Sequence, residues 1–117
     1  MKRFIPLLCF LSAPLSAQAA APAADSGLAE IRDLGRLNGQ ALACSYGETA
    51  ARIKKEMIGH APKSRRYGAV FEETTNEAFL AQSKLEPTDC PDGPTLNGKV
   101  DEVVQHLQAA LPAGAAQ

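Results

Sequence analysis

Hydrophobic residues recur at every third or fourth position through four stretches of this 117-residue chain. The most regular series is the last one, which consists of Leu96, Val100, Val103, Val104, Leu107 and Leu111. Such spacing puts apolar side chains on one face of a helix, and it predicts helices over residues 27–44, 46–59, 65–85 and 96–111. Because the chain shows no internal repeat and no alternation of strands with helices, we expect a small all-α bundle.

One motif sets the boundary between the first two predicted helices. Ser45 and Glu48 have the S-x-x-E spacing of a capping box, in which the serine side chain caps a new helix. The motif predicts that the first helix stops near Cys44 and that the second starts at Tyr46. A continuous helix through this point stays open as an alternative, and it would reduce the bundle from four helices to three.

Small residues form a second stripe along the first predicted helix. Gly35, Gly39 and Ala43 follow one another at intervals of four residues. Each glycine inside a helix costs roughly 1 kcal/mol relative to alanine, so some gain must offset the pair. A close helix crossing provides it, because a backbone without side chains lets a neighbouring helix approach. Arg36 and Asn38 exclude the membrane-embedded version of this pattern, which needs an apolar helix.

The first twenty residues have the pattern of a signal peptide. Lys2 and Arg3 precede an apolar run over Phe4–Leu15, and small residues follow at Ala17–Ala19. The apolar run is shorter than the roughly 20 residues that span a bilayer, so a membrane anchor is disfavoured. We expect residues 1–20 to be removed by cleavage near Ala19 to Ala21, and the product to be periplasmic or secreted.

Removal of the signal peptide leaves about 97 residues, the length of one small domain. We expect residues 21–25 to be a disordered lead-in, 26–112 a single helical domain, and 113–117 a disordered tail. Cys9 leaves with the signal peptide, so Cys44 and Cys90 remain. In an exported domain of this size, two cysteines without C-x-x-C spacing predict a structural disulfide.

The charges of the mature chain are unevenly distributed. Ten basic residues face thirteen acidic ones once Lys2 and Arg3 are gone, which gives a net charge of −3. A basic cluster nevertheless surrounds the connection between the second and third predicted helices. Its members, with the two flanking aromatic or titratable residues, are Arg52, Lys54, Lys55, His60, Lys63, Arg65, Arg66 and Tyr67. This cluster is either a solvated loop or a docking surface for an anionic partner such as a protein, phosphates of lipopolysaccharide or a membrane surface. Export disfavours nucleic acid.

Residues able to carry catalysis are sparse. The serines lack the G-x-S-x-G and S-x-x-K contexts of nucleophiles. His60 and His106 are the only histidines, and neither has a second ligand at the spacing of a metal site. We therefore predict no enzyme activity and no catalytic, cofactor-binding or metal-binding residue. A haem or metal carrier using Met57 with both histidines is the most distant alternative.

These observations favour a small exported binding protein that engages a protein or an anionic envelope component through the basic cluster. In outline, as a short exported helical chain with one disulfide, it looks like the periplasmic acid-stress chaperones of enteric bacteria. That similarity concerns architecture, and it implies an alternative function as a stress chaperone or as an inhibitor or immunity-type protein. The sequence predicts no transmembrane segment in the mature chain and leaves its oligomeric state open.

Overall fold

The computed structural model describes residues 26–112 of the chain. Its helices are α1 (Leu28–Ala43), α2 (Gly47–His60), α3 (Arg65–Ser83) and α4 (Gly93–Ala110), with a 3-10 turn, η1 (Pro87–Asp89), before the last of them. Among these residues, no helix combines the length and the hydropathy that crossing a bilayer requires.

The predicted all-α class is confirmed. The first two predicted helices are separate, so the described residues form four α-helices and not three. The largest shift from the predicted boundaries is in α4, which begins before Thr95. Asp92 is its N-cap and Pro94 lies in its first turn, where the missing N–H of proline removes no helical hydrogen bond. The predicted signal peptide, lead-in and tail lie outside the described residues.

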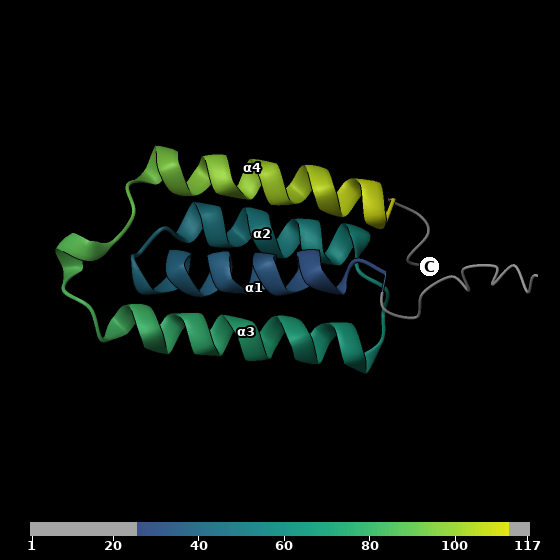
Figure 1. Cartoon of the computed structure of the whole chain (residues 1–117), viewed down its shortest axis with the longest axis horizontal. Coiled ribbons are helices and arrows are strands. Elements are labelled where there is room, and N and C mark those ends of the chain that lie inside the picture. The colour runs from purple at the N-terminus through teal and green to yellow at the C-terminus, as the bar shows by residue number, and fades with distance from the viewer. Residues whose placement is uncertain (1–25, 113–117) are drawn as a thin grey trace, which may run out of the picture.

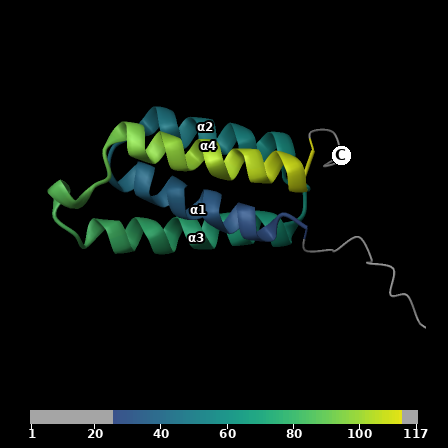
Figure 2. The ribbon, with the colours of Figure 1, turned by 45° about the horizontal axis from the view of Figure 1, so that its top comes forward.

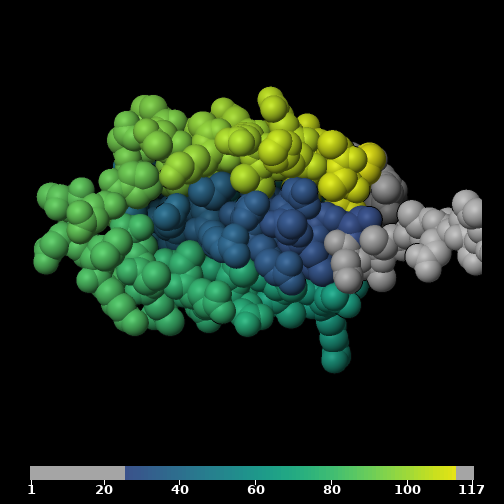
Figure 3. All heavy atoms as spheres, viewed as in Figure 1, coloured from purple at the N-terminus to yellow at the C-terminus, as the bar shows by residue number. Residues whose placement is uncertain are grey.

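The first helix, α1, lies at the centre of the bundle (Figure 1 and Figure 2). Successive helices run in opposite directions, with α3 on one side of α1 and the contacting pair α2 and α4 on the other. Within the described chain, α1 contacts all three other helices, whereas α3 contacts α1 alone. Figure 3 shows the result on one face, where α1 remains visible between α3 and α4. The bundle is therefore open on both sides of α3.

The hydrophobic core lies mainly between α1, α2 and α4. Its largest fully buried side chains are Ile31, Leu34, Ile53, Leu96, Val100 and Leu107. Burying each such side chain stabilises the fold by about 1.5–3 kcal/mol. Among the described residues of α3, Tyr67 is the one fully buried member of the hydrophobic core, and the other buried positions are Thr74 and Gln82. A different kind of contact must therefore hold α3 in place.

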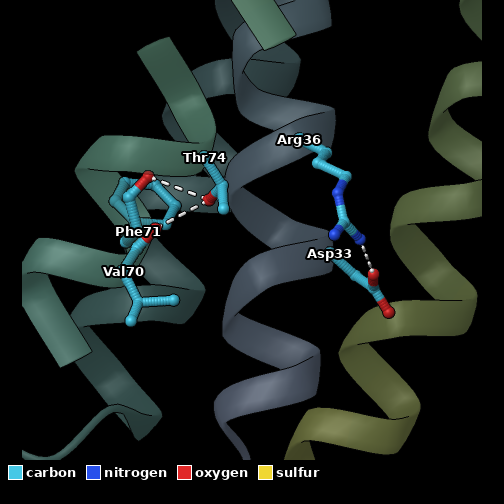
Figure 4. Close-up of polar contacts among 5 residues, drawn as sticks. All are labelled: Asp33, Arg36, Val70, Phe71 and Thr74. Atoms are coloured by element: carbon cyan, nitrogen blue, oxygen red, sulfur yellow. Dashed lines mark hydrogen bonds and ion pairs between the residues drawn. The ribbon is translucent and has the colours of Figure 1, made fainter. Parts of the chain in front are cut away.

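That contact is a close crossing of α1 and α3, which confirms the prediction from the glycine stripe. A Cβ atom added at Gly39 would lie 2.4 Å from the Thr75 carbonyl oxygen, and one added at Gly35 would overlap the Thr74 side chain. The Thr74 hydroxyl donates a hydrogen bond of 2.8 Å to the Val70 carbonyl within α3 (Figure 4), so this polar group is satisfied at the interface. Asn38 of α1 also donates to the hydroxyl of Thr75 over 3.2 Å.

The chain breaks between α1 and α2 by a different mechanism from the predicted capping box. Ser45 has a φ of 63°, in the left-handed region, and it makes no side-chain cap to α2, whose N-cap is Tyr46. The Tyr46 N–H donates to the Ala41 carbonyl over 2.8 Å, and the Ser45 N–H to the Leu42 carbonyl over 3.3 Å. This pair of bonds is a Schellman motif, so Ser45 ends α1 rather than starting α2.

Two links fasten α3 at its ends. The predicted disulfide is confirmed: Cys44, after α1, is bonded to Cys90, after η1, with their Cα atoms 5.9 Å apart. At the other end of α3, the buried Tyr67 hydroxyl donates a hydrogen bond of 2.7 Å to the carbonyl of Ser26. Together with the glycine crossing, these links fix the position of α3 relative to α1.

Candidate functional site

A groove lies between α2 and α3. The backbones of both helices approach α1, while no Cα atom of α2 lies within 8 Å of one in α3, so α1 forms the floor and the other two helices form the walls. The hollow has a volume of about 650 Å³. It is lined by Asn38, Leu42, Ala50, Ala51, Lys54, Met57, Ile58, Gly68, Phe71, Glu72, Thr75 and Asn76. We refer to it as the α2–α3 groove.

The α2–α3 groove exposes apolar side chains to solvent. Ile58 of α2 is 68% exposed and Leu42 of α1 is 47% exposed, while Met57 and Phe71 are partly buried against the core. Among the described residues, the large exposed apolar side chains belong to α1, α2, α3 and the residues just after α3, and none belongs to α4. Exposed apolar residues scattered singly need no explanation, but Leu42 and Ile58 line the same hollow beside Met57 and Phe71, which makes it a candidate interaction surface.

The other open face, between α3 and α4, carries more charged side chains. Arg36 and Gln40 of α1 line both hollows on that face, and Arg36 is paired with Asp33 at 2.8 Å (Figure 4). Lys99 and Glu102 of α4 also line it. Since its charges are mixed and partly paired, this face has the character of an ordinary solvated surface.

Two cations lie at one end of the α2–α3 groove. A second hollow of about 430 Å³ shares Met57, Ile58 and Gly68 with the groove and continues around the turn between the helices, where it is lined by Lys63 and Arg65. We call Lys63 and Arg65 the basic end.

A third cation, Lys54, lies in the α2 wall of the groove, and Glu72 lies in the α3 wall. Within the described chain, neither Lys54 nor the basic end (Lys63 and Arg65) forms an ion pair. Their charges are therefore available to an anionic partner.

Three other members of the predicted basic cluster contact other parts of the bundle. Arg52 forms an ion pair with Asp101 of α4. The Nδ1 atom of His60 lies 2.7 Å from the Leu111 carbonyl, and because a carbonyl can only accept, Nδ1 carries the hydrogen and donates it. Tyr67 is buried at the start of α3. These side chains face other parts of the bundle, and none of them lines the α2–α3 groove.

The remaining two members, Lys55 and Arg66, are exposed and do not line the groove. The separation within α2 could have been predicted from the sequence. Arg52 and Lys54 are two positions apart, which is about 200° around a helix, so they could not share one face. The exposure of Ile58 could be predicted from the sequence only weakly. A second apolar residue beside Met57 widens the apolar face of α2 beyond what one neighbouring helix covers.

The structure brings together no metal site among the described residues. No group of three or more histidine, cysteine or acidic side chains is placed to hold an ion in this part of the chain. Met57 lines the α2–α3 groove, His106 lines the hollow between α1 and α4, and His60 contacts the end of α4. The three side chains of the haem or metal alternative therefore lie on different surfaces.

Comparisons with known proteins give no match to this chain: no family model, no curated protein and no solved structure is similar to it. The case for a function therefore rests on the geometry of the groove.

Proposed function

We propose that this chain is a small exported, non-enzymatic binding protein that engages a protein or an anionic envelope component through the α2–α3 groove and its basic end. One observation carries the proposal: exposed apolar side chains and unpaired cations line two adjoining hollows that share Met57, Ile58 and Gly68. Apolar contact supplies affinity, and the cations steer an anionic partner toward the hollow and discriminate against cationic ones.

Support for export comes from two independent features. The residue pattern before residue 20 is that of a signal peptide. The disulfide between Cys44 and Cys90 fits an oxidising compartment such as the periplasm or the extracellular space, because cytosolic thiols are kept reduced. A binding protein in that location meets envelope proteins and anionic lipid headgroups.

The experiment that tests this function is affinity capture from a native envelope extract with the purified, disulfide-bonded protein. We expect the double variant Lys63→Glu/Arg65→Glu to lose the captured partner, because it reverses both charges of the basic end. The matched control is Lys84→Glu/Lys99→Glu, which makes the same charge change on exposed residues outside the groove. If both variants capture the partner as well as the unmodified protein does, the groove is not the contact surface and the proposal is wrong.

A second candidate is a chaperone that holds unfolded clients, and one observation favours it. Leu80 and Leu85 are more than half exposed and lie outside the α2–α3 groove, so apolar surface extends beyond a single docking site. A chaperone of this kind would suppress aggregation of unrelated denatured proteins, measured by light scattering. Suppression that survives Lys63→Glu/Arg65→Glu would support this candidate over a specific groove.

A further inference from the structure

We infer that the occupant of the α2–α3 groove is an amphipathic helix of a partner protein, with its apolar stripe against the groove and acidic residues over Lys63 and Arg65. This inference rests on the proposed function and narrows it from a broad class of partners to one kind of segment. Four features of the groove support it: its open side, its helical walls, its length and its charge.

The open side of the groove selects an occupant with two different faces. No Cα atom of α2 lies within 8 Å of one in α3, and the hollow between the two helices opens to solvent, so one face of a segment bound there stays in water. An acyl chain bound there would keep much of its apolar surface exposed, whereas ligand sites for such molecules enclose most of the ligand. An amphipathic helix buries its apolar stripe and leaves its polar face in solvent.

The walls of the groove also disfavour an extended peptide. An extended peptide that binds by β-augmentation pairs its backbone N–H and C=O groups with an exposed sheet edge. Both walls are α-helices, and the described residues contain no strand. A helical occupant satisfies its own backbone hydrogen bonds and needs only side-chain contacts from the walls.

The length of the groove fixes the number of contact positions. Its α2 wall extends from Ala50 to Ile58, which is about 12 Å at the 1.5 Å rise of a helix. Three apolar side chains at positions i, i+3 or i+4, and i+7 of an occupant cover about the same distance. Ile58 and Met57 would contact the position nearest the basic end, and Leu42 and Ala50 the position farthest from it.

The charges set the polarity of the occupant. Lys54, Lys63 and Arg65 are unpaired within the described chain, against the single carboxylate of Glu72 in the groove lining. The excess of positive charge lies toward the turn between α2 and α3. An occupant with acidic residues at that end complements it, whereas a basic helix would be repelled.

The test is selection from random peptides of about 16 residues, displayed on phage, against the immobilised disulfide-bonded protein. We expect the enriched peptides to show apolar residues at i, i+3 or i+4, and i+7, with Asp or Glu concentrated near one end. The affinity of a synthesised winner is then measured by fluorescence anisotropy. Ile58→Glu and Lys63→Glu/Arg65→Glu should each weaken binding about tenfold, which corresponds to ~1.4 kcal/mol.

Leu80→Glu is the matched control, since Leu80 is also exposed at 57% but lies outside the groove, and it should leave the affinity unchanged. Enriched peptides without helical periodicity or acidic bias would overturn the inference, as would a winner that binds Ile58→Glu normally. Self-association that Ile58→Glu abolishes, seen by sedimentation, would assign the groove to a second copy of this chain. Binding to phosphatidylglycerol vesicles that competes with the peptide would assign it to an anionic lipid surface.

These outcomes are separable from failure of the proposed function. Envelope capture that depends on the basic end, without helical peptides in the selected pool, overturns only the identity of the occupant. Capture that is unchanged in Lys63→Glu/Arg65→Glu overturns the proposed function itself.

Discussion

Replacing Gly39 with alanine tests the close crossing that positions one wall of the α2–α3 groove. The added Cβ would lie 2.4 Å from the carbonyl oxygen of Thr75, 2.6 Å from the backbone nitrogen of Phe79 and 2.7 Å from the Cβ of Ala78. Two of these atoms belong to the backbone of α3 and the third is fixed to it, so no side-chain rotation relieves the overlap. The variant must move α3 away from α1.

The magnitude follows from two opposing effects. Overpacking of a tight interface costs typically 1–3 kcal/mol, and the separation of α1 and α3 weakens their other contacts as well. Alanine also gains about 1 kcal/mol over glycine through its helix propensity. With three overlaps shorter than 3 Å, the steric cost lies at the upper end of that range, about 3 kcal/mol, so we expect a net loss of about 2 kcal/mol in the free energy of unfolding.

Gly98 provides the control, because a Cβ added there meets nothing within 4 Å. Gly98→Ala in α4 should stabilise the protein by about 0.5–1 kcal/mol through helix propensity alone. Urea titration and thermal unfolding, both followed by circular dichroism, measure the two variants, and the melting temperature of Gly39→Ala should fall by roughly 10 °C. A Gly39→Ala protein as stable as the unmodified one, or stabilised like Gly98→Ala, would refute the close crossing.

Two further predictions concern the links at the ends of α3. Replacing Cys44 and Cys90 with serine should lower the free energy of unfolding by about 4 kcal/mol, the chain-entropy value for opening a loop with a sequence separation of 46. Urea titration of the variant and of the oxidised protein measures the difference, and equal midpoints would show that the disulfide adds no stability. Tyr67→Phe removes the hydrogen bond to the Ser26 carbonyl and should cost about 1 kcal/mol in the same assay. No change in the midpoint would mean that this bond does not hold α3.

The central features of the fold could be predicted from the sequence because each rests on local chemistry. Helical periodicity identified four helices, and two glycines four residues apart identified the close crossing. The cysteine count identified the disulfide. The prediction that Ser45 caps α2 was wrong, because the same residue can start one helix or end another. The Schellman bonds to Leu42 and Ala41, which decide between these roles, depend on the backbone and not on a sequence motif.

The candidate site could be predicted only in part. The turn between α2 and α3 was identified from its charge, and the basic end lies there. The apolar half of the groove was not, because Met57 and Phe71 have the same helical spacing as core residues. Whether such a residue is covered depends on which helices become neighbours. Here α3 reaches α1 but not α2, and that is a property of the whole bundle.

The two ends of the described chain meet at one end of the bundle (Figure 1), where the Leu111 side chain packs over Gly27. The four helices thus trace an almost closed circuit. A short linker from residue 112 to residue 26 would complete it, and new termini could then be opened at the turn between α2 and α3. Every helix contact would persist in such a circular permutant, since its chain order alone has changed. Lys63 and Arg65 lie in that turn, so the new termini would be at the basic end. Additional residues could then be joined to α2 and α3, the two walls of the groove.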